Sequence, residues 1–269
     1  VETLGEELMD KTLQIIDWNI SYMNDWEKKT EFLFSKLNNY YCVILQEVGP
    51  WVAQCIREKY SKENYFVYSL DYRKPSKYDS GARRLGVMLI FSKAIKVIES
   101  GIIERNLFPD RTAWATIMCN NKKIKILGLH SITGCSYQSA KSIQYDTFTE
   151  FVDEYKPDII GMDANEPKVD SYDLDKMIFY NENGGGAKTF FKKVKESGMK
   201  DAYVVANDIT TCEEGKCLMI SHNVRRRGVV RYDFLFVDNN ISITKCNYDY
   251  DGAIKAGSDH ALIETDIQT

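Results

Sequence analysis

Near the end of the chain the sequence reads Gly257-Ser258-Asp259-His260-Ala261-Leu262-Ile263, an acid and an imidazole directly before an apolar run. The apolar run predicts a strand whose later residues pack in the core. The acid and the imidazole then lie at the start of this strand. The Asp259-His260 pair is therefore placed for chemistry rather than for packing.

Three other apolar, strand-like runs further upstream also end in polar side chains. These side chains are Glu47, His130, and Asp163 together with Asn165. Four polar clusters at four strand ends predict a single shared site, to which each strand contributes from its own end.

Composition limits the kinds of partner that the chain can attract. Its 269 residues contain 35 Lys and Arg against 39 Asp and Glu, a net charge of −4, so no global positive field recruits nucleic acid or an anionic membrane. A polyanionic partner would need a local basic patch. Seven cysteines, an odd count without CxxC pairs, favour reduced thiols and a cytoplasmic location, with secretion as the alternative.

No membrane segment is expected. Residues 1–11 are acidic and lack the apolar core of a signal peptide, and no apolar run approaches the roughly 20 residues that span a bilayer. The sequence also lacks repeats, linkers and low-complexity tracts. We therefore predict one domain over residues 1–269, with a core from about residue 13 to 266, no stable membrane association, and a monomer as the favoured state.

The order of predicted elements indicates an α/β fold. Strands and helices alternate first, as strand 13–20, helix 26–37, strand 42–48 and a helix from Pro50. Strands then follow one another at 65–70, 85–91, 95–102, 112–119 and 124–129, which favours antiparallel pairing. The rest reads as helix 137–155, strand 158–162, helix 188–195, and strands 202–206, 231–237, 241–244 and 260–265. This pattern suits two mixed, mostly antiparallel sheets packed face to face with helices outside.

Metal-assisted hydrolysis of a phosphate ester requires side chains of the kinds found at these strand ends. It needs carboxylates for a hard divalent cation, a group that orients water, and donors for the phosphoryl oxygens. Glu47 is the candidate metal ligand, although alone it would read as a surface residue that closes a strand. Asp163 and Asn165 lie on one side of an extended segment, where one can position water and the other can bind phosphate; an Asx turn is the alternative.

A further carboxylate, Asp233, lies inside the apolar strand 231–237. A carboxylate in such a strand is costly without a partner, and an imidazolium is the natural one. We therefore predict that Asp233 pairs with His260. His130 closes another apolar strand, whereas His222 reads as a loop residue.

Six short motifs carry a resemblance to a known family. In chain order they are Trp18-Asn19, Leu45-Gln46-Glu47, Leu129-His130-Ser131, Gly161-Met162-Asp163-Ala164-Asn165, Tyr232-Asp233 and Ser258-Asp259-His260. Their order and spacing resemble the endonuclease/exonuclease/phosphatase superfamily. This superfamily includes pancreatic-type deoxyribonucleases, abasic-site endonucleases, neutral sphingomyelinases and inositol polyphosphate 5-phosphatases.

The resemblance implies a four-layered α/β sandwich and a magnesium-dependent attack of water on phosphorus, with Mn²⁺ as an alternative ion. At the matching positions, Glu47 would bind the metal with help from Asn19 and Asp259.

The same resemblance implies the catalytic roles. Asp163 would activate or orient the water, and Asn165 would hold the phosphate. The Asp233–His260 pair would contact or protonate the phosphate, and His130 would assist the leaving oxygen.

Arginines near these motifs are candidates for substrate contact. In the deoxyribonuclease-like branch a Glu precedes the middle strand, whereas this chain has Arg83 and Arg84 there. The densest basic cluster comprises Arg225, Arg226, Arg227 and Arg231, just before the Asp233 strand. It could contact a nucleic-acid backbone or a polyphosphate, or it could be a solvated loop.

We therefore predict a Mg²⁺-dependent phosphodiesterase and favour a nuclease that acts on DNA. A phosphatase or a lipid phosphodiesterase, sphingomyelinase-like or specific for inositol phosphates, is the alternative on the same fold. A catalytically inactive binding module is the second alternative. The sequence lacks the long hydrophobic loops that would favour a lipid substrate.

Overall fold

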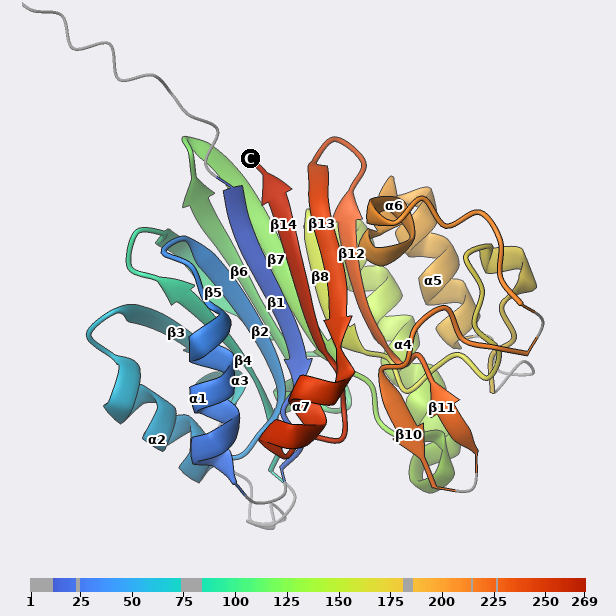
Figure 1. Ribbon diagram of the computed structural model, residues 1–269, viewed down its shortest axis with the longest axis horizontal. Coiled ribbons are helices and arrows are strands. Elements are labelled where there is room, and N and C mark those ends of the chain that lie inside the picture. Colours follow the sequence, from blue (N-terminus) through green and yellow to red (C-terminus); the bar gives the residue numbers. More distant parts are fainter. Residues whose placement is uncertain (1–11, 23–24, 74–83, 181–185, 214, 226) are drawn as a thin grey trace, which may run out of the picture.

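Four layers make up the molecule, two six-stranded sheets face to face with helices on both outer sides (Figure 1). The computed structural model describes residues 12–22, 25–73, 84–180, 186–213, 215–225 and 227–269, those at 134–138 without their side chains. This architecture confirms the predicted α/β sandwich of two mixed sheets.

The first sheet has the strand order β13-β14-β1-β2-β4-β3. Its strands are β1 (Thr12–Asn19), β2 (Tyr41–Val48), β3 (Asn64–Tyr68), β4 (Gly86–Ser92), β13 (Ser242–Asp249) and β14 (Leu262–Gln268). Strands β1 and β2 run parallel, and the other paired neighbours run antiparallel. A parallel pair needs a crossover connection, which helix α1 (Trp26–Lys36) provides.

The second sheet repeats this plan in the order β5-β6-β7-β8-β12-β9. Its strands are β5 (Lys96–Gly101), β6 (Thr112–Cys119), β7 (Lys122–His130), β8 (Ile159–Asp163), β9 (Met199–Asp201) and β12 (Asp233–Asp238). Strands β7 and β8 form its parallel pair, joined by helix α4 (Gly134–Tyr155). A separate hairpin consists of β10 (His222–Val224) and β11 (Gly228–Val230).

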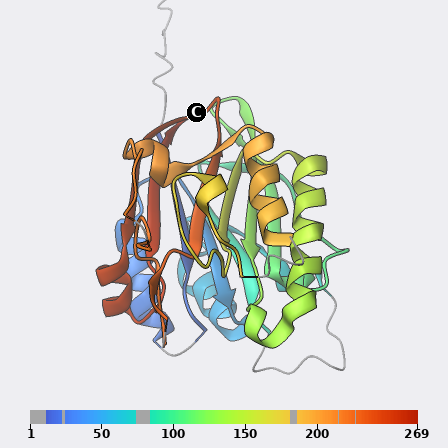
Figure 2. The same cartoon turned by 90° about the vertical axis from the view of Figure 1, so that its right-hand side faces the viewer.

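Helices cover the outer face of each sheet. Helices α1, α2 (Pro50–Tyr60) and α7 (Tyr250–Ala256) pack on the first sheet through one apolar cluster. Helix α4 and helix α5 (Gly186–Glu196) lie side by side on the second sheet (Figure 2). Short helical segments are α3 (Ser69–Tyr72), α6 (Ala202–Ala206), and the turns Pro109–Arg111 and Leu174–Lys176.

Two further findings concern membrane spans and cysteines among the described residues. None of the described helices is long and apolar enough to cross a membrane. The six described cysteines are free thiols.

The structure corrects several predicted elements. Residues 202–206, predicted as a strand, form helix α6, because the Asp201 side chain caps this segment by accepting hydrogen bonds from the Tyr203 and Val204 amides. The predicted strand 65–70 ends at Tyr68, and helix α3 follows it. The β10–β11 hairpin, strand β9 and helix α7 were not predicted. These elements are short, and tertiary contacts rather than periodicity define them.

Two glycines allow the sheets to approach closely at their centre. Gly128 on β7 and Gly161 on β8 are register partners. A Cβ at Gly161 would lie 2.6 Å from the Asp17 Oδ1 atom and 2.7 Å from the Ile44 Cδ1 atom, both on the first sheet. A Cβ at Gly128 would lie 2.9 Å from Ile44 Cγ2. Both positions therefore require the absence of a side chain.

Gly161→Ala should lower the free energy of unfolding by about 1–3 kcal/mol, because the added methyl group forces the sheets apart in a closely packed core. Denaturant titration measures the change. Gly49→Ser is the control, since a Cβ there meets nothing within 4 Å and serine suits the position before helix α2. A Gly161→Ala protein as stable as the parent would contradict the close sheet contact.

Candidate active site

A row of three polar side chains crosses the end of the second sheet. His130 on β7 is the register partner of Asp163 on β8, and Asp163 is the register partner of Asp233 on β12. His130 and Asp163 follow Gly128 and Gly161 by two residues, so they face the first sheet, as the glycines do. All three polar side chains are buried. Strand register therefore assembles three of the predicted residues in one line.

The first sheet supplies residues opposite this row. Asn19 ends β1 and donates from Nδ2 to the Asp163 Oδ2 atom at 2.9 Å. Glu47 lies where the β2–β4 register shifts, with a φ of 59°, and its Oε1 atom is 3.7 Å from the His130 Nε2 atom. The irregular backbone aims the Glu47 carboxylate toward the second sheet, and the ends of β1, β2, β7 and β8 meet in one site.

The predicted pair of Asp233 and His260 is present. The His260 Nδ1 atom lies 2.9 Å from the Asp233 Oδ2 atom. Burial alone would lower the pKa of His260, but the Asp233 and Asp163 carboxylates raise it to about 10. His260 is therefore an imidazolium at neutral pH, with Nδ1–H bound to Asp233 and Nε2–H available to another acceptor.

Asp163 has the environment of a proton acceptor. Burial raises its pKa to about 7, against the opposing charge of His260 and with help from the charge of Asp233. Its carboxylate also accepts a hydrogen bond from the Asn165 amide N–H at 2.9 Å. A carboxylate whose pKa lies near neutral pH can take a proton from water efficiently.

Asn165 forms the Asx turn that the sequence offered as one alternative. Its backbone N–H closes an Asx turn onto Asp163, and it adopts a φ of 49°. Its side-chain Nδ2 donates to the Ser131 carbonyl at 2.9 Å and to the Asp163 Oδ2 atom at 3.2 Å. The Asn165 amide thus orients the Asp163 carboxylate, and its contact with phosphate stays a prediction.

Sequence reasoning missed Arg111, which lies beside His130. The Arg111 Nη1 atom is 2.6 Å from the His130 Nδ1 atom. Burial first, and the charge of Arg111 second, hold the pKa of His130 well below its usual value. A signal was available, because Arg111 precedes β6, and the start of β6 lies beside the end of its antiparallel neighbour β7.

The charges of Asp259 and Glu47 both act on Lys29. Both carboxylates raise the pKa of Lys29, although burial lowers that pKa by more. The Lys29 Nζ atom donates to the Ser21 carbonyl at 2.8 Å, beside Asn19. Oxygen donors such as those of Asn19, Glu47 and Asp259 are of the kind that a hard divalent cation prefers, and their joint binding of one ion stays a prediction.

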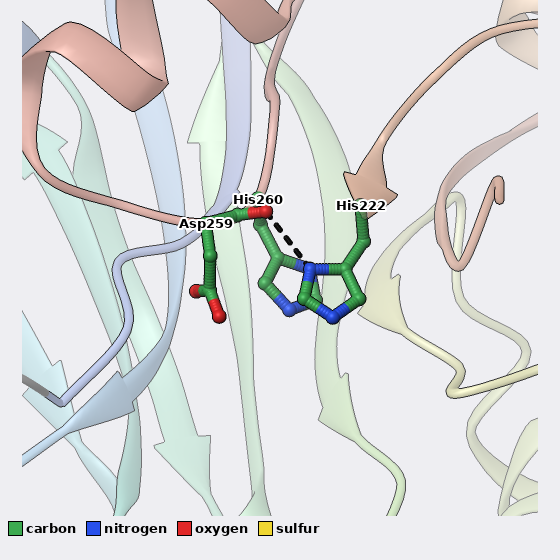
Figure 3. Close-up of side chains that lie close together, drawn as sticks. All are labelled: His222, Asp259 and His260. Atoms are coloured by element: carbon green, nitrogen blue, oxygen red, sulfur yellow. Dashed lines mark hydrogen bonds between the residues drawn. The ribbon is translucent and has the colours of Figure 1, made fainter. Parts of the chain in front are cut away.

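Two groups of acidic and imidazole side chains among the described residues lie close enough to hold a metal ion. One comprises Asp163, Asp233 and His260, and the other comprises His222, Asp259 and His260 (Figure 3). His260 belongs to both, so the two groups are continuous.

The structure removes Arg231 from the predicted substrate contacts. Its side chain is 0% exposed, with Nη2 2.7 Å from the Asp201 Oδ2 atom and Nε 3.2 Å from the Asp170 Oδ2 atom. Arg231 therefore neutralises two acids inside the protein and does not reach a substrate.

The other predicted arginines are in different positions. Arg225 and Arg227 are exposed on the β10–β11 hairpin, and the Arg227 guanidinium lies 4.5 Å from the centre of the Tyr180 ring. Arg84 lies just before β4, where its charge acts on Tyr68. Arg83 and Arg226 lie outside the described residues.

Comparison with known proteins supports the fold. No protein-family model and no curated protein sequence matches the chain. Among solved structures, the 3′–5′ exonuclease NExo from Neisseria meningitidis matches with a TM-score of 0.68, 15% identity, and coverage of 96% of this chain and 100% of that chain. TDP2 from D. rerio, complexed with a single-strand DNA product, matches with a TM-score of 0.64, 18% identity, and coverage of 97% and 100%.

The human Nocturnin catalytic domain with a bound sulfate anion is similar too, with a TM-score of 0.65, 12% identity, and coverage of 97% of this chain and 96% of that chain. All three neighbours are members of the endonuclease/exonuclease/phosphatase superfamily. The chain has the fold of this superfamily, which confirms the fold that its six motifs implied.

Arg231→Ala should destabilise the protein by about 3–5 kcal/mol, because it leaves the buried Asp170 carboxylate and the half-buried Asp201 carboxylate without their counter-charge. Arg225→Ala removes an exposed arginine and should change stability by no more than about 0.5 kcal/mol. Denaturant titration of both variants measures the difference. Equal stabilities would mean that Arg231 has no structural role.

Proposed function

We propose that this protein is a metal-dependent phosphodiesterase that cleaves DNA. The observation that carries the proposal is the meeting of Glu47 on the first sheet with His130 and Asp163 on the second, beside the Asp233–His260 pair. Three kinds of group thus lie around one point: carboxylates for a divalent cation, an acceptor for the proton of water, and a cationic donor. Support also comes from the superfamily fold.

The metal site is proposed from its oxygen donors. Glu47 would hold Mg²⁺ with Asn19 and Asp259. When bound, the ion would polarise a phosphoryl oxygen and stabilise the charge that develops on it. Lys29 lies close to these acids, and its ammonium balances part of their charge.

The protein side chains provide the remaining chemistry. The Asp163 carboxylate, held by Asn19 and Asn165, orients a water molecule and accepts its proton. The His260 imidazolium, held by Asp233, donates from Nε2 to a phosphate oxygen.

Neutral His130 and cationic Arg111 lie next to this pair. From there they can stabilise the leaving oxygen, Arg111 through its charge and His130 through a ring N–H.

DNA is the proposed substrate because of the charge beside the site. The β10–β11 hairpin carries exposed Arg225 and Arg227, and its first residue, His222, contacts His260. These arginines can therefore bind backbone phosphates that flank the scissile one, as in other nucleic-acid complexes. The TDP2 structure noted above contains a DNA product, and a Neisseria NExo structure is bound to a product DNA hairpin.

His260→Ala and Asp163→Asn should each reduce kcat by at least about a hundredfold, because general acid–base and water-orienting groups typically contribute 10²–10⁴. The measurement is cleavage of plasmid, single-stranded DNA, RNA, sphingomyelin and inositol phosphates with Mg²⁺, with EDTA as the blank. Asp251→Asn, an exposed change on helix α7, is the control.

Near-parental rates in either active-site variant, with its fold shown intact by circular dichroism, would remove that residue from the mechanism. If the protein hydrolysed only sphingomyelin or inositol phosphates, DNA would be wrong as the proposed substrate.

Glu47→Gln should raise the Mg²⁺ concentration for half-maximal activity by about tenfold, because a neutral amide is a weaker ligand for a hard cation than a carboxylate. Activity is measured across a Mg²⁺ titration. The exposed Glu58→Gln on helix α2 should leave the curve unchanged. A Glu47→Gln curve superimposable on that of the parent would exclude Glu47 as a metal ligand.

A further inference from the structure

One face of helix α4 carries three buried polar side chains to which the mechanism above gives no role. They are Lys141, Gln144 and Tyr145, three and four residues apart, which places them on the same side of the helix. Each side chain belongs to a residue that is at most 2% exposed. A helix that packs on a sheet normally buries an apolar stripe, so packing alone does not explain these polar residues.

Gln144 holds the segment that follows β7. Its Oε1 atom accepts a hydrogen bond from the Ile132 amide at 2.9 Å, and its Nε2 atom donates to the His130 carbonyl at 3.1 Å. The side chain thus binds the backbone on both sides of Ser131, whose carbonyl accepts from the Asn165 Nδ2 atom at 2.9 Å. The end of β7 is therefore fixed to helix α4.

Tyr145 and Lys141 hold the turn that follows β8, residues 164–166. The Tyr145 hydroxyl donates to the Ala164 carbonyl at 2.5 Å, and the Lys141 Nζ atom donates to the Asn165 carbonyl at 2.7 Å. Asn165 has a φ of 49°, a left-handed conformation that surrounding contacts must stabilise. The same residue orients the Asp163 carboxylate through its backbone amide and its Nδ2 atom. The turn therefore connects helix α4 to the proposed proton acceptor.

A buried counter-charge accompanies Lys141. Its Nζ atom lies 2.9 Å from the Glu166 Oε1 atom, and the two side chains are 3% and 1% exposed. The Glu166 Oε2 atom accepts a hydrogen bond from the Tyr180 amide at 2.9 Å. A buried ion pair often contributes less to stability than a well-packed apolar pair, because both charges lose their hydration. Stability therefore explains this pair poorly, and its geometric effect is to fix the ammonium beside the Asn165 carbonyl.

We propose that Lys141 is a positioning residue, which acts through Asn165 to hold the Asp163 carboxylate in the orientation that it needs to bind water. Lys141 is buried and does not itself contact substrate. Loss of its bond to the Asn165 carbonyl loosens the turn, and the Asp163 carboxylate then loses its fixed orientation. Orientation of this kind affects the chemical step rather than substrate binding. The effect on turnover, but not the effect on the turn, rests on the proposed function.

The kinetic test compares two substitutions that both break the ion pair. Lys141→Met removes the donor to the Asn165 carbonyl, whereas Glu166→Gln keeps it. Lys141→Met should lower kcat by about a hundredfold with little change in KM, because a misplacement of about 1 Å can have an effect of this size. Glu166→Gln should lower kcat by no more than about tenfold. Equal losses in the two variants, or a change in KM alone, would contradict the proposal.

A double variant separates positioning from stability. Lys141→Met alone leaves the Glu166 carboxylate buried without its counter-charge, which lowers the denaturation midpoint and can prevent folding. Adding Glu166→Gln removes this charge and should restore the midpoint, while kcat stays about a hundredfold below that of the parent. Denaturant titration and steady-state kinetics measure the two quantities. Recovery of kcat together with the midpoint would mean that Lys141 acts through stability alone.

Amide hydrogen exchange tests the turn without a substrate. The Asn165 amide, which donates to the Asp163 Oδ1 atom, should lose protection in the double variant and keep it in Glu166→Gln. Equal protection in the two variants would overturn the role of Lys141. If this difference in exchange is found but the parent hydrolyses none of the substrates, the proposed function is wrong and the effect of Lys141 on the turn still holds.

Discussion

The structure depends on how closely its two sheets approach at Gly128 and Gly161. Sheets normally pack about 10 Å apart, with side chains filling the space between them. At these two positions the side chains of Asp17 and Ile44 take the space that a Cβ would need. Two residues further along the same strands, polar side chains take the place of the glycines. There the side chains of His130 and Asp163 reach side chains of the first sheet. The candidate site therefore depends on two adjacent features of β7 and β8. Glycines bring the sheets together inside the core, and polar side chains follow them at the ends of the two strands.

The close approach also concentrates buried charge. Asp17, Asp163 and Asp233 all lie between or at the ends of the sheets, and burial raises the pKa of Asp17 well above its usual value. The Asp17 Oδ1 atom accepts a hydrogen bond from Gln46 Nε2 at 2.6 Å, which opposes part of this rise in pKa. The His260 imidazolium offsets the charge of the other two acids. Buried carboxylates with so few cations beside them favour the binding of a metal ion, because an added positive charge relieves their repulsion.

The strands and the meeting of their polar ends could be predicted from the sequence, because both follow from the local alternation of apolar runs and polar residues. Apolar runs that end in polar residues identify strand ends, and the residues at those ends, such as Glu47 and Asp163, do meet. The failures involve pairings between distant segments. Arg231 adjoins a predicted catalytic strand and belongs to a basic cluster, yet Asp170 and Asp201, which bury it, lie 61 and 30 positions away in the sequence. Arg111 and His222 were missed for a similar reason, since each is placed by a neighbouring strand rather than by its own segment.

One serine links the surface arginines to the Asp233–His260 pair. The Ser221 Oγ atom accepts hydrogen bonds from the Tyr232 and Asp233 amides, and the Ser221 carbonyl accepts one from the Ala261 amide at 2.7 Å. Ser221 immediately precedes the β10–β11 hairpin, so the hairpin is fixed to the start of β12 and to the segment before β14. The same contacts set the distance between Asp233 and His260. The arginines that we propose to bind flanking phosphates and the Asp233–His260 pair that we propose to act on the scissile phosphate therefore share one support. In this way a recognition element can position a substrate for chemistry without belonging to either sheet.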